Sequence, residues 1–349
     1  MNGDGKRRTA IVLLSGGLDS MLAARIMQDH DVDVVGVHLY TGLCITEHKR
    51  RTGQRDGKGR IPQNPAFRIA DQLGIPLEVL DISDTYLDVI TKPKYGRGSG
   101  VNPCKDCRIH MFERADQFRR EIGADFIVTG EVLGQRPMSQ VKPNLEFIHK
   151  RTGIEDLILM PLSAKLLPPT LPEREGWVDR ERLYAISGRS RKPQLELVRK
   201  FGIDEFEQPA GGCCFLTDEN YARKFRDLFT FDPDRRLDLE DVILLGVGRH
   251  FRTSERAKVV VGRYAEENAV IERHAGGRPL LVPACVNGPT AVVIGVPEPD
   301  ELELMARIVA RYSAGRDQPA VDIEVRRPGA TEILTVPPVV LDEVEPMRV

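Results

Sequence analysis

Short runs of apolar and β-branched residues alternate with longer segments of helical periodicity through the first half of the chain. The runs predict buried strands at 9–15, 32–40, 76–83 and 124–130, and the periodic segments predict helices at 20–29, 64–74 and 108–123. Strands that alternate with helices form parallel sheets through right-handed crossovers. The pattern therefore predicts an α/β fold with a doubly wound parallel sheet, which binds its ligand beyond the carboxyl ends of the strands.

The composition of the sequence changes in the second half of the chain. Residues 161–216 are rich in Pro, Gly and charged residues, and they contain a predicted helix at 192–202. Further on, apolar runs predict strands at 241–251, 257–264, 279–296 and 320–329, a hairpin turn at Asn287–Gly288 and an amphipathic helix at 300–315. We therefore predict a main domain over residues 1–235 and a smaller α+β domain over residues 236–349.

Composition and charge narrow the class of protein. The 349 residues are 41% hydrophobic and 29% charged, which is typical of a globular protein with a sizeable core. The net charge is −2, so an RNA partner must be met by a local basic patch. No apolar run approaches the ~20 residues of a membrane span, and the first residues lack the apolar core of a signal peptide. These features predict a cytoplasmic protein without a membrane partner.

A basic segment interrupts the first half just after the second predicted strand. Residues 47–60, EHKRRTGQRDGKGR, carry a local charge of +4 on the predicted ligand side of the sheet. Such a segment is either a solvated loop or a contact to an RNA backbone. Arg136 and Gln140 could contact phosphate or the target base, and RNA phosphate or ATP could be bound by Lys165, Arg189, Arg191 and Lys192. For each of the basic residues the alternative is a solvated surface charge.

The first predicted strand leads into S-G-G-L-D-S at residues 15–20, a pattern suited to phosphate. Gly16 and Gly17 let the backbone approach an anion closely, and the N–H groups at the start of the following helix point toward it. Ser15 and Ser20 add hydroxyl donors. The Lys of a Walker loop is missing. A carboxylate among phosphates needs a cation between them, so Asp19 is predicted to be a Mg²⁺ ligand.

Four cysteines suggest sulfur or metal chemistry. Cys104 and Cys107 form a C-x-x-C pair before a predicted long helix, whose positive end favours thiolates, and Cys213 and Cys214 follow far along the chain. The C-x-x-C pair with Cys213 could ligate a [4Fe–4S] cluster with one open iron. Alternatively, one thiol carries a persulfide that another resolves, or zinc is bound with Cys214 or His110 as fourth ligand, or the cysteines are simply buried.

The S-G-G-L-D-S segment resembles the signature of the PP-loop ATP pyrophosphatases, which split ATP between its α- and β-phosphates. The resemblance implies an adenine nucleotide alpha hydrolase-like fold that uses ATP and Mg²⁺. It also implies the residues that surround the nucleotide. These are Ser15, Gly16, Gly17, Leu18, Asp19 and Ser20 at the phosphates, His38 and Leu39 at the adenine, and Thr129 and Gly130 at the border of the site.

Other segments resemble a narrower group. NPCKDCRIHMF at 102–112 is similar to the N-P-C-x-x-C segment of bacterial tRNA 2-thiouridine synthases, and TGEVLGQRPMSQ at 129–140 stands where those enzymes have T-G-H. Residues 161–218 resemble a thiouridylase-like or 4-thiouridine-synthetase-like branch, in which a single Cys follows P-A-G-G. That Cys corresponds to Cys213, with Cys214 at an aliphatic position. Residues 248–272 resemble a small RNA-binding domain of ribosome-quality-control proteins.

These resemblances imply an ATP-dependent tRNA sulfurtransferase. Such an enzyme adenylates a carbonyl oxygen of a tRNA base, with uridine favoured, and replaces that oxygen by sulfur from a cluster or a persulfide. The implied catalytic residues are Asp19, Cys104, Cys107 and Cys213, of which the cysteines hold the cluster and Asp19 holds Mg²⁺. The sulfur donor would be a cysteine desulfurase or free sulfide, and a homodimer is left open. The rival hypotheses are a PP-loop ligase or sulfurtransferase for a small metabolite, and a zinc-stabilised RNA-binding module.

Overall fold

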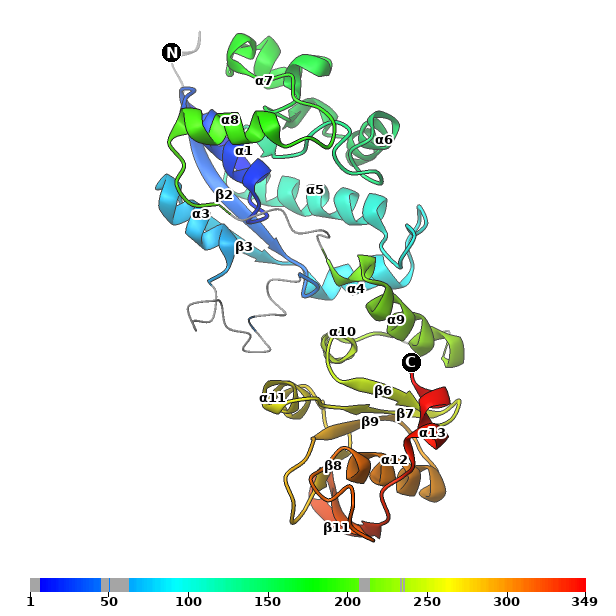
Figure 1. Ribbon diagram of the computed structural model, residues 1–349. Helices are drawn as coiled ribbons and strands as arrows, with labels where there is room; N and C mark the ends of the chain where they lie inside the picture. The colour runs from blue at the N-terminus through cyan, green and yellow to red at the C-terminus, as the bar shows by residue number, and fades with distance from the viewer. Residues whose placement is uncertain (1–6, 45–49, 51–62, 207–213, 233, 235) are drawn as a thin grey trace. The chain divides into compact units, whose positions relative to one another are not determined.

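The computed structural model describes residues 7–44, 50, 63–206, 214–232, 234 and 236–349, and the chain folds into two compact units (Figure 1). The first unit comprises Met1–Thr41 and Pro62–Cys213, and the second comprises Gly42–Ile61 and Cys214–Val349. The division falls earlier along the chain than the predicted one at 235/236. Helix α9 (Glu219–Phe231) lies in the second unit, where its Tyr221 hydroxyl donates to the carbonyl of Val242 at 3.0 Å.

A parallel sheet forms the centre of the first unit. Its strands are β1 (Arg8–Leu13), β2 (Val32–Tyr40), β3 (Leu77–Asp81), β4 (Phe126–Thr129) and β5 (Ile158–Leu159), in the order β3-β2-β1-β4-β5. Leu13, at the end of β1, lies opposite Val37 on one side and Thr129 on the other. The strand order reverses between β1 and β4, which is where an open parallel sheet binds its ligand.

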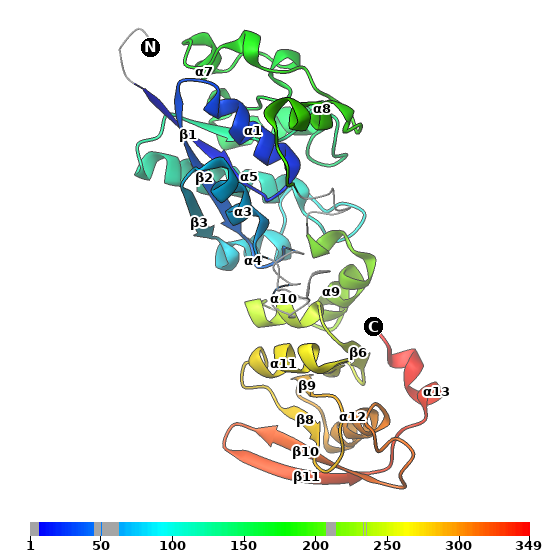
Figure 2. The same cartoon turned by 60° about the vertical axis from the view of Figure 1, so that its left-hand side comes forward.

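Helices cover both faces of this sheet, as the doubly wound prediction requires (Figures 1 and 2). Ala10, Val12 and Leu14 face a core formed with α1 (Leu18–Gln28), α3 (Pro65–Leu73) and α8 (Lys192–Phe201). Ile11 and Leu13 face the opposite core, formed with α5 (Cys104–Glu121) and α6 (Lys142–Thr152). Alternate residues of β1 therefore fill two cores, as expected of a strand buried on both faces. The remaining helices of the unit are α4 (Ser83–Thr91) and α7 (Leu171–Arg174).

The second unit is an antiparallel sheet with helices, which confirms the predicted α+β class. Its strands are β6 (Arg249–Arg252), β7 (Ala257–Val261), β8 (Leu280–Pro283), β9 (Ala291–Gly295), β10 (Val321–Arg327) and β11 (Ala330–Val336), in the order β11-β10-β8-β9-β7-β6. Besides α9, the described residues of this unit form α10 (Leu239–Leu245), α11 (Ala265–Arg273), α12 (Pro299–Arg311) and α13 (Leu341–Val344). Helix α12 packs on one face, and α10 and α11 pack on the other.

Local predictions fail where apolar runs are short. The strand predicted at 241–251 is helix α10 followed by β6, because Asp238 caps the helix by accepting from Asp241 N at 2.6 Å. A short apolar run does not distinguish a buried helix from a strand. The helix predicted at 108–123 begins at Cys104. Asn287–Gly288 lies inside a longer link between β8 and β9, so it is not a two-residue hairpin turn. No helix in the described ranges is long and apolar enough to span a membrane.

Candidate functional site

The S-G-G-L-D-S segment forms the turn between β1 and α1. Gly16 has a φ of +83°, and a Cβ there would lie 2.7 Å from the Cβ of Pro65, so this position requires glycine. Gly17 is the extended N-cap of α1, and the Ser20 hydroxyl donates to its carbonyl at 2.8 Å. The N–H groups of the first helical turn have no acceptor within the helix. The turn therefore presents unpaired donors and the positive end of a helix dipole, as a phosphate site requires.

The end of β4 closes the other side of this turn. A Cβ at Gly130 would lie 2.4 Å from Ser20 N and 2.5 Å from the carbonyl carbon of Asp19, so only glycine fits there. Thr129, one residue earlier, is buried at 2% exposure. The structure thus brings 129–130 against the 15–20 turn, as the sequence predicted for residues that border one nucleotide.

Asp19 projects from the first turn of α1 with its two carboxylate oxygens in different surroundings. Oδ2 accepts from Nε2 of Gln135 at 2.6 Å and lies 3.6 Å from Nη2 of Arg191. Oδ1 is buried and accepts no hydrogen bond from any described residue. Buried acceptors are normally satisfied, so an open carboxylate oxygen beside a phosphate-binding turn fits a hard divalent cation. Asp19 could therefore hold the predicted Mg²⁺ through Oδ1.

Two glutamines behind Asp19 belong to the site but were missed from the sequence. Gln135 follows β4 in the chain, and its Oε1 accepts from Nε2 of Gln194 at 3.0 Å. Gln194 lies in the first turn of α8 and is fully buried. The sequence analysis selected Arg136 and Gln140 from the same loop. Gln135 could have been found by considering every polar residue that follows a strand at the ligand end of the sheet.

A buried serine fixes the loop that carries Gln135. The Ser163 hydroxyl accepts from Leu133 N at 3.0 Å and donates to the carbonyl of Ile186 at 2.7 Å. Gly188 N then donates to the carbonyl of Leu133 at 2.7 Å. The segment that enters α8 therefore runs beside the loop that leaves β4, which places Arg191 and Gln194 next to Gln135.

His38 and Leu39, predicted at the adenine, lie at the end of β2. His38 is buried, with Nδ1 2.8 Å from the carbonyl of Leu14 and Nε2 3.3 Å from Nδ2 of Asn64. A ring nitrogen that faces a carbonyl must donate, so Nδ1 carries the proton and Nε2 accepts from Asn64. His38 therefore ties β2 to the end of β1, and Leu39 packs partly buried against the core beneath α5.

Cys104 and Cys107 occupy the first turn of α5. Sγ of Cys104 accepts from Nδ2 of Asn102 at 2.9 Å, and Sγ of Cys107 lies 3.9 Å from Sδ of Met111. Both cysteines are partly buried. An amide donor and the N-terminus of a helix both stabilise negative charge on sulfur. The pair is therefore placed for nucleophilic or metal-binding chemistry.

The third predicted cysteine, Cys213, lies outside the described residues. Cys214 is partly buried. In the part of the chain that the structure describes, no three His, Cys, Asp or Glu side chains gather as a metal site. His110, considered as a zinc ligand, has its Nε2 2.9 Å from the Thr85 hydroxyl, and burial together with Arg114 lowers its pKa.

A buried ion pair connects the cysteine helix to the end of β4. Glu131, which is 2% exposed, accepts from Nε of Arg108 at 2.9 Å, and His149 lies 3.6 Å from its other oxygen. Burial alone would raise the pKa of Glu131, but Arg108 and His149 outweigh it and hold the pKa below its usual value. Arg108 follows Cys107 directly, and Glu131 follows Gly130. This pair therefore fixes the C-x-x-C turn relative to the phosphate turn.

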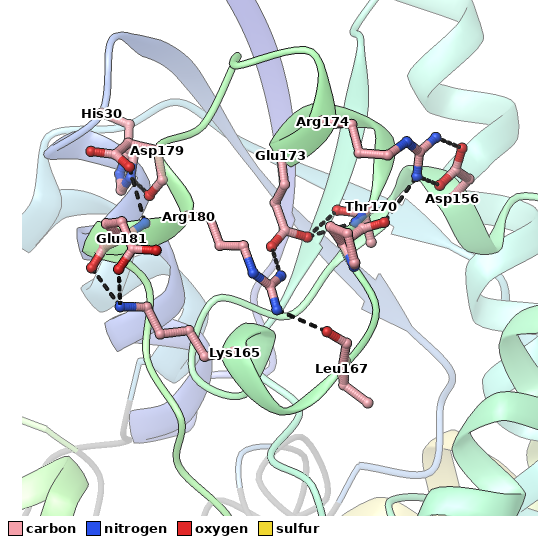
Figure 3. Close-up of polar contacts among 11 residues, drawn as sticks. His30, Asp156, Lys165, Leu167, Thr170, Glu173, Arg174, Asp179, Arg180 and Glu181 are labelled. Atoms are coloured by element: carbon pink, nitrogen blue, oxygen red, sulfur yellow. Dashed lines mark hydrogen bonds and ion pairs between the residues drawn. The ribbon is translucent and has the colours of Figure 1, made fainter.

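The other basic residues predicted to bind phosphate differ in the contacts that they make within the protein. Lys165 donates to the carbonyl and carboxylate of Glu181 at 2.8 and 3.1 Å, within a network of polar contacts between 156 and 181 (Figure 3). Arg189 and Lys192 are exposed. The basic segment at 47–60 lies outside the described residues except for Arg50. Arg191 is the basic candidate that faces the phosphate turn.

Two segments of the chain match known protein families. Residues 8–150 match the family described as the tRNA methyl transferase HUP domain, and residues 248–347 match the family described as the NFACT protein RNA binding domain. These matches confirm the resemblance to PP-loop tRNA-modifying proteins at the N-terminal end and to an RNA-binding domain at the C-terminal end.

Curated relatives match about a third of this chain. The tRNA-specific 2-thiouridylase MnmA of Mycolicibacterium smegmatis is 37% identical over 124 residues, which is 34% of this chain and 34% of that protein. MnmA of Mycolicibacterium vanbaalenii is 39% identical with the same coverage. The chain thus spans about a third of the length of the curated relatives it matches. A solved 4-thiouridine synthetase–RNA complex with bound ATP is 21% identical, covers 58% of this chain and 53% of its own, and has a TM-score of 0.33, which is too low to carry an argument.

Proposed function

We propose that this protein is an ATP-dependent tRNA sulfurtransferase that releases AMP and pyrophosphate. One observation carries the proposal: the ion pair between Arg108 and Glu131 joins the C-x-x-C turn to the glycine that closes the phosphate turn. A group that activates an oxygen with ATP and a group that delivers sulfur must lie close to one substrate atom. The similarity to tRNA 2-thiouridylases over 124 residues supports the same assignment.

The first step forms an adenylated base. The carbonyl oxygen of the base, with uridine proposed, attacks the α-phosphorus of ATP, an O–P bond forms and pyrophosphate leaves. The 15–20 turn would bind the phosphates through its backbone N–H groups and the hydroxyls of Ser15 and Ser20. Mg²⁺, held through Asp19, would neutralise the charge of the leaving pyrophosphate. His38 and Leu39 at the end of β2, and Thr129 and Gly130, would border the nucleoside.

The second step replaces the activated oxygen by sulfur. A terminal persulfide sulfur attacks the carbon, AMP leaves with the oxygen, and a second thiol attacks the inner sulfur to release the thiolated base and leave a disulfide. Cys104, Cys107 and Cys213 are the proposed thiols. They are also the residues that would hold a [4Fe–4S] cluster, which when bound would supply a sulfur-binding iron.

The second unit is proposed to hold the tRNA. Its match to an RNA-binding family over 248–347 supports this role. The proposed source of sulfur is a cysteine desulfurase or free sulfide. We also propose that the protein acts in the cytoplasm and that it forms a homodimer.

Purification under anaerobic conditions tests the role of the cysteines. Iron, labile sulfide and zinc would be measured with the absorbance spectrum for the wild type, Cys104→Ala, Cys107→Ala and Cys213→Ala, with Cys285→Ala as an exposed control. About four irons, lost in each of the first three variants, would establish the cluster. Zinc would instead reduce the pair to a structural role, and absence of metal would leave the persulfide route.

Turnover tests the reaction itself. AMP formation would be measured with and without tRNA, and the nucleosides of the treated tRNA would be analysed by mass spectrometry. The proposal expects AMP release stimulated by tRNA and a sulfur-containing nucleoside. AMP release that is indifferent to tRNA would contradict it and favour a small-metabolite substrate.

A further inference from the structure

The guanidinium of Arg191 is loosely held beside the phosphate turn. Its Nη2 lies 3.6 Å from Oδ2 of Asp19, beyond hydrogen-bond distance, and its side chain is 26% exposed. It makes no other ion pair or hydrogen bond with the described residues. By contrast, Arg108 lies 2.8 Å from Glu131 in the same unit. Arg191 therefore keeps nearly all of its five N–H donors available for an incoming ligand.

The element that carries Arg191 is rigid. Arg191 is the N-cap of α8, whose Leu197 and Val198 are buried in the core beneath α1, and Gly202 ends the helix in the left-handed conformation. One turn into α8, Gln194 is fully buried and hydrogen-bonded to Gln135. The backbone of Arg191 is therefore fixed relative to Asp19, and only its side chain is free to move.

The two oxygens of the Asp19 carboxylate have different roles. The amide of Gln135 occupies Oδ2, and the amide of Gln194 fixes Gln135, so Oδ1 is the oxygen that remains for a cation. A cation on Oδ1 removes most of the attraction between Asp19 and Arg191, because it neutralises the carboxylate. An arginine released in this way beside phosphates finds a better partner, since guanidinium binds phosphate oxygens in a bidentate manner.

We propose that Arg191 is an exchangeable phosphate ligand: it pairs with Asp19 in the empty site and binds the pyrophosphate portion of ATP once Mg²⁺ occupies Asp19. Gln135 and Gln194 are positioning residues that keep Oδ1 directed at the cation. This inference rests on the proposed function, since it requires that residues 15–20 hold the phosphates of ATP. It adds a specificity element from α8, outside the region that matches the HUP family.

Binding measurements on the full chain without tRNA test the proposal. The ligands are Mg²⁺ with α,β-methylene-ATP, Mg²⁺ with pyrophosphate, and AMP, titrated by calorimetry into wild type, Arg191→Gln and Arg191→Lys. Arg199→Gln is the matched control, because Arg199 is exposed in the last turn of the same helix. A charged hydrogen-bond pair predicts a loss of about 10- to 100-fold for the first two ligands in Arg191→Gln, a smaller loss in Arg191→Lys and unchanged AMP binding.

A second measurement tests the exchange. In EDTA, Asp19→Asn should bind pyrophosphate more tightly than the wild type, because Arg191 is released and a negative charge is removed. In Mg²⁺ the same variant should bind it more weakly. The gain in EDTA should shrink in the double variant Asp19→Asn with Arg191→Gln.

Several results would overturn the inference. These are unchanged pyrophosphate affinity in Arg191→Gln, an equal loss for AMP, and an equal loss in Arg199→Gln. Thermal melting of each variant shows whether a loss reflects unfolding, and Arg191→Lys retains the charge if Arg191→Gln does not fold. If Arg191→Gln loses affinity for pyrophosphate but not for AMP, and the wild type does not thiolate tRNA, the proposed function is rejected and the inference stands.

Discussion

Two partly buried carboxylates, one in each unit, show how differently an aspartate can be used. Asp227 in α9 is fully paired: its oxygens accept from Arg252 at 3.0 and 2.6 Å and from Lys258 at 2.9 Å. Asp19 has one oxygen held by an amide, one without a described partner, and a loose arginine. A carboxylate with complete pairing holds a fold together, whereas one left half-paired near free N–H groups is prepared for a ligand.

The pKa of Asp227 follows from this difference. Burial alone would raise it, but Arg252 and Lys258 outweigh burial and lower it. Lys258 is fully buried, and Asp227 is a charged partner of its ammonium group. Removing the charge of Asp227 should therefore lower the stability of the protein, whereas removing the charge of Asp19 should lower its activity.

The largest expected effect is on turnover. Asp19→Asn should lower tRNA-stimulated AMP formation by about a thousandfold, because the cation that neutralises pyrophosphate loses its ligand. The urea midpoint should stay close to that of the wild type, since Oδ1 contributes no internal hydrogen bond within the described structure. A variant that unfolds more easily but retains turnover would reverse the comparison.

Asp227→Asn should have the opposite profile. Loss of the charge leaves Lys258 and Arg252 partly unpaired in a buried site, which should lower the free energy of unfolding by about 3 kcal/mol. Urea denaturation of the full chain checks this value. At a temperature where the variant is folded, its affinity for Mg²⁺ and pyrophosphate should match that of the wild type.

Glu131→Gln sharpens the comparison within the first unit, since Glu131 forms an ion pair with Arg108 through one oxygen and lies next to the site. At pH 7 it should lower the free energy of unfolding by about 2 kcal/mol, because Arg108 loses a charged partner. The folded-state pKa of Glu131 lies below the ordinary value of a glutamate, about 4.5. Its stabilising contribution is therefore complete above that value and is lost as the pH falls through the folded-state pKa.

Urea midpoints of wild type and Glu131→Gln at several pH values check the sign. The gap between the two proteins should be widest near pH 7 and should close in acid. A gap that widens as the pH falls would mean that Glu131 is not stabilised as a carboxylate.

The smallest expected effect is on metal affinity. Gln135→Leu removes the donor to Oδ2 of Asp19, so the carboxylate can turn and pair more closely with Arg191. The Mg²⁺ concentration that half-saturates nucleotide binding should rise about tenfold, as for other residues that orient a metal ligand. Titration of Mg²⁺ at fixed α,β-methylene-ATP checks this, with Gln117→Leu on the exposed face of α5 as the control.

Prediction from sequence succeeded where the signal is local. The first four strands of the parallel sheet, the glycine turn and the C-x-x-C pair each depend on neighbouring residues, and the structure contains all of them. The two-residue strand β5 was not predicted, because so short a segment carries no periodicity. Prediction failed at α10, because a short buried helix and a short buried strand share the same apolar composition. The role of Cys213 stays a prediction.

The sequence by itself determined that a glycine turn with an acidic residue leads into α1 and that two thiols lie near the start of a long helix, because backbone conformation and helix ends follow from local residue types. Only the tertiary structure decided that Gln135, Gln194 and Arg191 surround Asp19 and that Glu131 holds Arg108. These partners come from loops and helix ends whose meeting depends on how the cores on both faces of the sheet pack. A single polar residue in a loop has no periodicity that reveals its partner.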